Sequence, residues 1–187
     1  MSKEYKDIED MISDGELELE VTISDGESLM DSLDDVGDLG RFRGFEVCSG
    51  YEGKAIIPVR GSKGSAGYDF SIVEDVTIEP MSFSGALFTG IKAYMMDGEV
   101  LEMYPRSSLF KNYGVIFANS VGIIDSDYYN NTSNEGNIGV MLYNLKDKAV
   151  TIPAGTRVAQ GIFTIYFLAD GDTADADRVG GIGSTGK

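Results

Sequence analysis

The spacing of polar and apolar residues changes near residue 41, and the longer part of the chain beyond it has the pattern of β-structure. Short runs rich in Val, Ile, Tyr and Phe alternate there with Gly, Asn and Asp, the residues that favour turns. No long run repeats its apolar residues at helical spacing. The pattern predicts an all-β sandwich or closed barrel with many turns. The expected strands include residues 45–47, 77–78, 87–89, 115–117, 138–145 and 157–167.

The first 40 residues have a different pattern. Apolar side chains recur at helical spacing over residues 5–12, alternate with polar ones over 17–23, and recur again over 29–36 behind Ser28, a good helix cap. One interpretation is an acidic, marginally stable tail. The other is a small helix–strand–helix module that docks on the rest of the chain or on another protein, because it has too little apolar surface to fold alone.

These differences divide the chain into three parts. Residues 1–40 are expected to form a short acidic α/β extension, and residues 41–168 the β-barrel. Residues 169–187 are first acidic and then glycine-rich, which predicts a mobile C-terminal arm.

Charge limits the choice of partners. The 187 residues include 31 acidic and 15 basic side chains, for a net charge of −16. Residues 1–40 alone contain 14 acidic and 2 basic side chains, so the remainder of the chain is close to balanced. Such a field disfavours stable binding to a nucleic acid backbone. A small anionic substrate would need arginines or a metal ion to reverse the local potential.

The residue types present also limit the chemistry. With one cysteine, Cys48, and no histidine, a disulfide framework is excluded and a zinc site would need an unusual ligand set. Catalysis is therefore expected to use carboxylates, hydroxyls, arginines, backbone amides and a hard cation such as Mg²⁺. No run approaches the roughly 18 apolar residues of a membrane span, so we expect a cytoplasmic protein without membrane contact.

Five short polar motifs are spread through the β-rich part. In order they are SAGYDF (65–70), PRSSLF (105–110), ANSVGIIDSDYYNN (118–131), GTRVAQGIF (155–163) and RVGGIGSTG (178–186). Each is weak alone, but in this order and spacing they resemble the five motifs of the trimeric dUTPases, over residues 44–187. The resemblance implies a jelly-roll-like distorted β-barrel, a homotrimer and Mg²⁺-dependent hydrolysis of dUTP to dUMP and pyrophosphate.

The resemblance also assigns roles at the phosphates. Asp125 corresponds to the aspartate that activates the attacking water, and Asp69 to the one that reaches Mg²⁺ through water. Asp127 is interpreted as a poorer candidate for the base, on the expectation that its side chain points to the other face of the segment. The residues that correspond to phosphate ligands are Arg106, Ser107, Ser108, where the family commonly has Gly, and Gln160.

The third motif would recognise the base and the sugar. In the family it forms a β-hairpin whose backbone pairs with uracil, so that cytosine would leave buried polar groups unpaired. Tyr128 corresponds to the residue that packs on the deoxyribose and excludes a 2′-hydroxyl; a core tyrosine is the alternative. The positions that correspond to the uracil-binding backbone and amide are Asn119, Gly122, Ile123, Ile124 and Gly139.

Two departures from the family concern the hairpin and the arm. Residues 129–135, YNNTSNE, replace a shorter turn and enlarge the tip of the hairpin. In the fifth motif, Arg178 corresponds to a γ-phosphate ligand but lies one residue closer to the glycine pair than in many relatives. Ile182 replaces the phenylalanine that stacks on the base. The remaining contacts of the arm would come from Gly183, Ser184 and Thr185.

The sequence therefore predicts a dUTP diphosphatase with active sites shared between subunits. In the family each site takes its first, second and fourth motifs from one subunit, the third from another and the fifth from the third. Two alternatives remain. One is a deaminase of the same fold acting on dCTP, which the form of the third motif disfavours. The other is a non-catalytic regulator whose acidic extension binds a protein partner. In a virus or phage, the place of action would be the host-cell cytoplasm.

Overall fold

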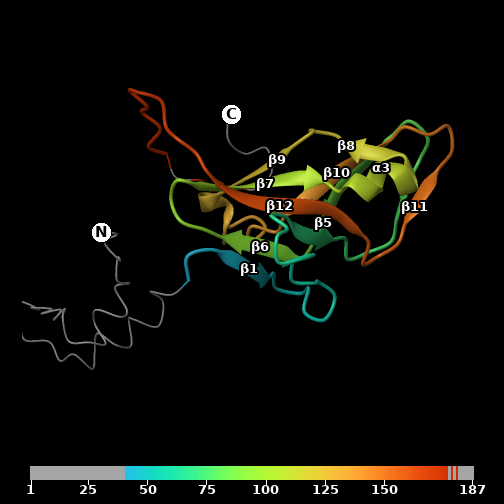
Figure 1. Ribbon diagram of the computed structural model, residues 1–187, viewed down its shortest axis with the longest axis horizontal. Helices are drawn as coiled ribbons and strands as arrows, with labels where there is room; N and C mark the ends of the chain where they lie inside the picture. Colours follow the sequence, from blue (N-terminus) through green and yellow to red (C-terminus); the bar gives the residue numbers. More distant parts are fainter. Residues whose placement is uncertain (1–40, 177, 179, 181–187) are drawn as a thin grey trace, which may run out of the picture. The chain divides into compact units, whose positions relative to one another are not determined.

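The computed structural model describes residues 41–176, 178 and 180 (Figure 1). The predicted acidic α/β extension, residues 1–40, and the end of the arm, residues 181–187, lie outside the described residues. By its contacts the chain divides into two units, Met1–Gly40 and Arg41–Lys187, and the fold below is that of the second. Its strands are β1 (Gly44–Val47), β2 (Val59–Arg60), β3 (Tyr68–Ser71), β4 (Val76–Ile78), β5 (Phe83–Phe88), β6 (Ile91–Tyr94), β7 (Glu99–Pro105), β8 (Val115–Phe117), β9 (Gly122–Asp125), β10 (Gly139–Asn144), β11 (Val150–Ile152) and β12 (Arg157–Ile165).

All of the strand pairs are antiparallel, and the longest strand organises the largest sheet. β12 pairs with β3 along one edge and with β7 along the other, within a sheet of order β2-β3-β12-β7-β9 (Figure 1). A second sheet has the order β5-β10-β8, and β1-β6 and β11-β4 form two-stranded ladders. Together they form a jelly-roll-like barrel, so the predicted all-β fold class is confirmed.

The core fills the space between the sheets with branched and aromatic side chains. Phe70, Leu101, Leu142 and Ile152 are fully buried. Phe45 packs edge-on against Phe70, with 5.3 Å between ring centroids. The apolar strand positions of the sequence thus supply the hydrophobic surface whose removal from water stabilises the fold.

The expected strands coincide with β1, β4, β5, β8, β10 and β12, but several elements were missed. β3, β6, β7 and β9 have mixed polar and apolar residues, which a search for apolar runs does not detect. Helix α3 (Ser107–Tyr113) was also missed, because its seven residues are too few for helical periodicity. Residues 166 and 167, expected at the end of the last strand, follow β12 instead.

A buried asparagine joins three segments of the barrel. The side chain of Asn144, at the end of β10, is fully buried. Its Nδ2 donates to the carbonyl oxygens of Ile78 at 3.0 Å, Glu79 at 3.1 Å and Lys148 at 2.9 Å, while its Oδ1 accepts from the backbone amide of Lys146 at 2.9 Å. One amide therefore satisfies backbone groups that would otherwise be buried without partners.

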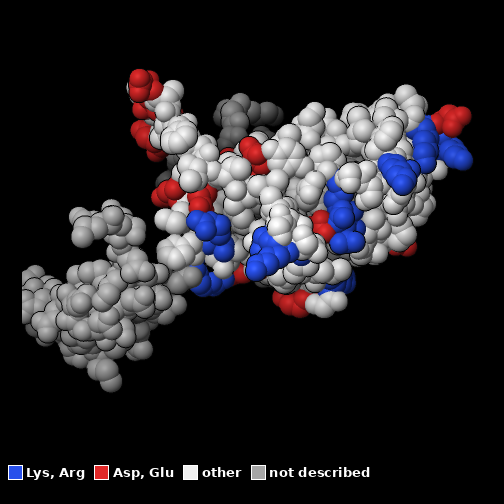
Figure 2. Space-filling model, viewed as in Figure 1, with Lys and Arg blue, Asp and Glu red and all other residues white. Residues whose placement is uncertain are grey.

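The surface shown in Figure 2 carries both signs of charge. Lys and Arg side chains lie there in separate small patches with Asp and Glu beside them, rather than in one basic stripe. The expectation of no stable nucleic acid binding stays a prediction. Among the described residues, no helix is long and apolar enough to cross a membrane.

Replacing Asn144 by alanine should lower the free energy of unfolding by about 3 kcal/mol, because buried backbone groups would lose their partners. Urea unfolding followed by tyrosine fluorescence, at one fixed protein concentration, measures the change. Asn112→Ala, at an exposed position of α3, is the matched control and should change stability by less than about 0.5 kcal/mol. Equal stability of the two variants would contradict a structural role for Asn144.

Candidate active site

The first, second and fourth motifs meet in one row of the large sheet. Asp69 on β3 lies opposite Gln160 on β12, and Gln160 lies opposite Tyr104 on β7. The Nε2 atom of Gln160 donates to the carbonyl oxygen of Pro105 at 3.4 Å. The antiparallel register of β12 thus brings together three motifs that are about 90 residues apart in the sequence.

Two arginines neutralise the carboxylate in this row. Arg106, which follows β7, forms an ion pair with Asp69 Oδ2, and Arg157 Nη1 lies 2.9 Å from the same oxygen. The Asp69 side chain is only 10% exposed, so it needs such partners. Among the described residues, the buried Nη1 of Arg106 has no well-aligned hydrogen-bond acceptor, although its charge is paired. A donor of this kind suits an anionic oxygen of a ligand.

Arg157 is a site residue that the sequence did not reveal. In a regular strand it would point away from Gln160, three positions on. The register of β12 against β3 shifts between Arg157 and Ala159, and this irregularity returns the Arg157 side chain to the face of Asp69. The bulge depends on tertiary pairing, and the only signal in the sequence is an arginine close to the fourth-motif glutamine.

A small polar cavity lies beside the two arginines. It has a volume of about 180 Å³, and its lining includes Arg106, Ser108, Asn112 and Arg157. Ser107, also expected to bind phosphate, is exposed in the first turn of α3. The predicted phosphate ligands Arg106 and Ser108 are therefore brought together, with Arg157 beside them.

The third motif lies elsewhere in the same chain. Asp125 ends β9, an edge strand, and lies opposite Val100 of β7 with its side chain 51% exposed. On β7, Val100 is four residues from Tyr104, which marks the row of Asp69. Four residues along a strand and three strand spacings across a sheet place Asp125 roughly 20 Å from Asp69. The predicted base and the predicted phosphate ligands are thus apart within one chain.

The expected hairpin of the third motif is not formed by paired strands. β9 pairs with β7, whereas β10 pairs with β5 and β8. Between them, a 3₁₀ helix (Ser126–Tyr128) and the longer connection 129–138 separate the two arms. The positions expected to contact uracil are accordingly distributed: Asn119 lies in the exposed turn before β9, Gly122, Ile123 and Ile124 lie in β9, and Gly139 begins β10.

Asp127 does not point away from Asp125, and the expectation that it would was wrong, because side chains two positions apart in a strand share a face. The 3₁₀ helix turns its carboxylate toward Arg178, whose Nε donates to Asp127 Oδ1 at 2.7 Å. Nη2 of the same arginine donates to Asp125 Oδ2. Arg178 thus bridges both carboxylates on the third motif of its own chain; the supply of the fifth motif by another subunit stays a prediction.

Tyr128 is 5% exposed and belongs to the core, so the alternative considered for it, a core tyrosine, describes its packing. Its hydroxyl donates to the carbonyl oxygen of Asn137 at 3.1 Å and accepts from Nδ2 of Asn134 at 2.8 Å. The guanidinium carbon of Arg178 lies 5.6 Å from its ring centroid. The hydroxyl is engaged by the protein, and the contact of Tyr128 with a deoxyribose stays a prediction.

The enlarged connection is an ordered loop. Asn131 is buried; its Nδ2 donates to the carbonyl oxygen of Tyr128 at 2.8 Å, and its Oδ1 accepts from the backbone amides of Ser133 and Asn134. Gly136 closes the loop at φ +81°, where a Cβ would lie 2.5 Å from the Tyr128 carbonyl oxygen. These bonds are local, so the loop is defined by its own asparagines and glycine.

The loop also docks on β1 and β6. The Tyr129 hydroxyl donates to Glu46 at 2.6 Å, and the Lys92 ammonium donates to Asn130 at 2.6 Å and pairs with Glu135 at 3.6 Å. The hydrogen bond from Tyr129, followed by that from Arg41, holds the pKa of Glu46 below its ordinary value. Burial, and then Glu46, raises the pKa of Tyr129. The end of the third motif is therefore joined to β1 and β6 by charge-assisted bonds.

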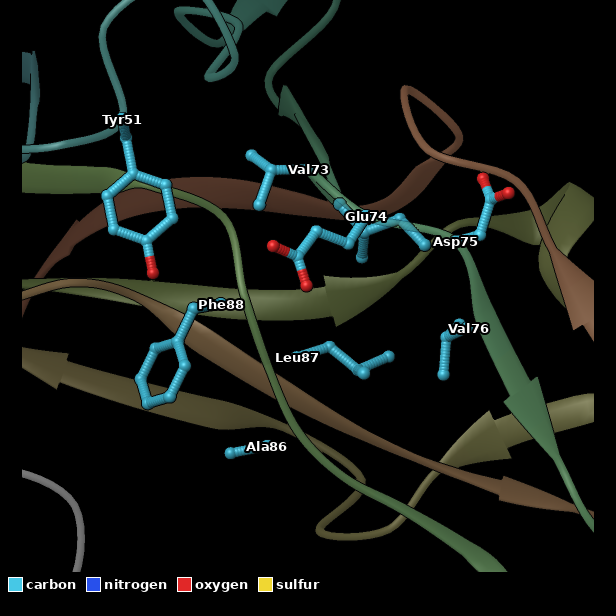
Figure 3. Close-up of a pocket in the computed structure, with 9 residues that line it drawn as sticks. Tyr51, Val73, Glu74, Asp75, Val76, Ala86, Leu87 and Phe88 are labelled. Carbon is cyan, nitrogen blue, oxygen red and sulfur yellow. The ribbon is translucent and has the colours of Figure 1, made fainter.

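Two other features are not part of the predicted site. A cavity of about 170 Å³ lies beside β4 and β5, and Figure 3 shows the Tyr51 hydroxyl and the Glu74 carboxylate directed into it. None of the predicted site residues lines it.

Cys48 is buried, and burial raises the pKa of its thiol to about 11. The thiol is protonated at neutral pH and therefore is not a nucleophile.

The side chains of the predicted site suit Mg²⁺ only through a bridging water molecule. In the described part of the chain, no three carboxylate or thiol side chains converge as a metal cage would require. Asp69 offers one carboxylate, whose Oδ2 is occupied by two arginines. This arrangement fits an ion bound mainly by triphosphate oxygens and by water, with Asp69 accepting from a metal-bound water.

Four predicted ligands of the arm, Ile182, Gly183, Ser184 and Thr185, lie outside the described residues.

Comparison with known proteins agrees with this geometry. The family model described as dUTPase matches residues 53–186. The deoxyuridine 5′-triphosphate nucleotidohydrolase of Lactococcus lactis is 46% identical over 149 residues, 78% of this chain and 99% of that protein; that of Wolinella succinogenes is 37% identical over 138 residues, which are 71% of this chain and 88% of that protein. The crystal structure of the Streptococcus mutans dUTPase superposes with a TM-score of 0.66 at 42% identity, covering 68% of this chain and 99% of that one. The chain belongs to the dUTPase family and is a nucleotide hydrolase.

The docking of the loop predicts a pH dependence of stability. Because the pKa of Glu46 is lowered by folding from 4.5, its contribution is complete above about pH 4.5 and is lost as the pH falls through the lower, folded-state value. The wild-type melting temperature should therefore fall more between pH 5 and pH 3 than that of Glu46→Gln, as measured by scanning calorimetry at about 0.1 M salt. Glu52→Gln, at an exposed position, should follow the wild type. Parallel curves for all three proteins would contradict the assignment.

Proposed function

We propose that the chain hydrolyses dUTP to dUMP and pyrophosphate as a Mg²⁺-dependent homotrimer whose active sites are shared between subunits. Membership of the dUTPase family supports dUTP as the substrate. The proposal that sites are shared rests on one observation. In a single chain, Asp125 lies roughly 20 Å from the row of Asp69, Arg106 and Gln160. An in-line attack at one phosphorus needs both groups within a few ångströms, so a second chain must supply one of them.

The chemistry follows from the residues on each side of such an interface. Arg106, Arg157, Ser108 and Gln160 would hold the triphosphate, with guanidinium groups matching its oxygens. Bound Mg²⁺ would supply charge neutralisation and orientation of the phosphates. Asp125, exposed at the sheet edge, takes a proton from a water whose oxygen attacks the α-phosphorus. The bond from the α-phosphorus to the bridging oxygen breaks, and pyrophosphate leaves with that oxygen.

An apolar sheet face supports the assembly. On the outer side of the β5-β10-β8 sheet, Phe83, Tyr143 and Ile116 form one cross-strand row, in which Phe83 and Ile116 are 62% and 40% exposed. Met141, two residues before Tyr143 on β10, adds to the same face. Contiguous exposed apolar surface of this kind is typical of subunit interfaces. The cytoplasmic location and a protein partner for residues 1–40 stay predictions.

Asp125→Asn should retain dUTP binding and lose turnover by a factor of ~10² to 10⁴, because the change is isosteric and removes the base. A pyrophosphate-release assay with dUTP measures kcat, and equilibrium binding of a non-hydrolysable dUTP analogue measures affinity. The same assay with dCTP and dTTP tests the choice of substrate. An Asp125→Asn enzyme with wild-type kcat would contradict the role of Asp125 as the base.

Sharing of sites predicts complementation between two inactive variants. Arg106→Ala and Asp125→Asn should each be inactive alone, but mixed trimers contain sites with Arg106 from one chain and Asp125 from the other. Random mixing at equal amounts should restore about a quarter of the wild-type activity. The mixture is refolded together and its trimers are verified by sedimentation and mass spectrometry. Verified mixed trimers without activity would show that each chain forms its own site.

A further inference from the structure

We propose that Asn134, a residue of the enlarged loop, is a positioning residue that fixes the Tyr128 ring and thereby helps to exclude a ribose 2′-hydroxyl. The inference rests on the proposed function, because it takes the predicted contact between Tyr128 and the sugar of dUTP as its premise. The loop supplies a donor at the far end of this ring: Nδ2 of Asn134 donates to the Tyr128 hydroxyl at 2.8 Å.

The neighbours of Asn134 fix the orientation of its amide. Its Oδ1 accepts from Nδ2 of Asn131 at 2.8 Å and from the backbone amide of Gly136 at 3.1 Å. Because only the oxygen of an amide side chain can accept, these two donors assign Oδ1 to their side and leave Nδ2 to face Tyr128. Asn131 is itself buried, and its Nδ2 also donates to the Tyr128 carbonyl oxygen. Asn134 therefore acts on the Tyr128 hydroxyl as a donor.

This assignment also fixes the direction of the hydroxyl proton. Because the Tyr128 hydroxyl accepts from Asn134, its own proton is available to donate, and the carbonyl oxygen of Asn137 accepts it at 3.1 Å. Asn137 is in turn fastened to the barrel, since its Oδ1 accepts from the backbone amide of Gly90 at 3.0 Å. A directed chain of hydrogen bonds therefore runs from the loop through Tyr128 to the barrel and holds the ring at its hydroxyl end.

The position of these bonds matters for the choice of sugar. A side chain rejects a 2′-hydroxyl by occupying the space of its oxygen atom, so the side chain must not give way. The bonds to Tyr128 lie at the end of the ring farthest from the backbone, where a small change in the Cα–Cβ torsion produces the largest displacement. Without the bond from Asn134 the ring should tilt more easily and make room for the extra oxygen.

The test compares dUTP with UTP, which differs from it by that hydroxyl alone. In Asn134→Ala, the ratio of kcat/KM for dUTP to kcat/KM for UTP should fall about fivefold, the effect of one net hydrogen bond. A merely structural role would lower both values alike and leave their ratio unchanged. Thr132→Ala, at an exposed position of the same loop, is the matched control and should keep the wild-type ratio. A wild-type ratio in Asn134→Ala would overturn the positioning role.

A second variant tests the hydrogen bond without any nucleotide. Tyr128→Phe keeps the ring and removes the hydroxyl. At one fixed protein concentration, it should lower the melting temperature less in an Asn134→Ala background than in the wild type, because the bond between the two side chains is already absent there. Equal losses in both backgrounds would overturn the hydrogen bond. Tyr128→Phe should also lower the ratio of dUTP to UTP hydrolysis, which keeps the test valid if Asn134→Ala does not fold.

Failure of the proposed function would be recognised separately. A wild type that hydrolyses neither nucleotide would overturn the proposed function. The affinities of non-hydrolysable analogues of dUTP and UTP then supply the same ratio without turnover, and Asn134→Ala should again lower it about fivefold. An unchanged affinity ratio would overturn the role of Asn134.

Discussion

The arrangement of the site depends on the pairing of β12 along both of its edges. Backbone hydrogen bonds to β3 and β7 fix the register of nine residues, and with it the row in which Asp69, Gln160 and Tyr104 lie side by side. A shift of one residue would turn Gln160 to the opposite face of the sheet. Gly161 permits this register, because a Cβ there would lie 2.8 Å from Phe70 and 2.9 Å from Leu101. The phosphate-binding side chains are thus positioned by the rigid centre of the fold.

The same sheet that brings the first, second and fourth motifs together places the third motif away from them. β9 occupies the far edge of β7, and its register places Asp125 at the opposite end of β7 from Arg106. Under the proposed function, a chain with this topology would contribute its first, second and fourth motifs to one site and its third motif to another. Assembly would therefore be a condition of catalysis, which gives the apolar face of the β5-β10-β8 sheet a functional as well as a stabilising role.

The loop 129–135 shows how an insertion can be accommodated near the predicted catalytic aspartate. Its own asparagines satisfy its backbone, and Lys92 and Glu46 fasten it to β1 and β6. The carboxylates of Asp125 and Asp127 are bonded instead by Arg178. The side chains that dock the loop are thus different from those that contact Arg178.

The sequence by itself determined the fold class, because alternating and short apolar runs require a half-buried sheet, and its motifs singled out Asp125, Asp69, Arg106 and Gln160 as predicted site residues. It did not reveal α3, whose seven residues are too few for helical periodicity, nor Arg157, which a bulge in β12 turns toward Asp69. The expectation that Asp127 lies on the other face from Asp125 was wrong, because side chains two positions apart in a strand share a face, and the segment is in any case a 3₁₀ turn. The bulge was decided by tertiary pairing, because the backbone hydrogen bonds between β12 and β3 join residues that are distant in sequence and leave no periodic signal. Helix α3 and the 3₁₀ turn have local hydrogen bonds, but both are too short to give a periodic pattern.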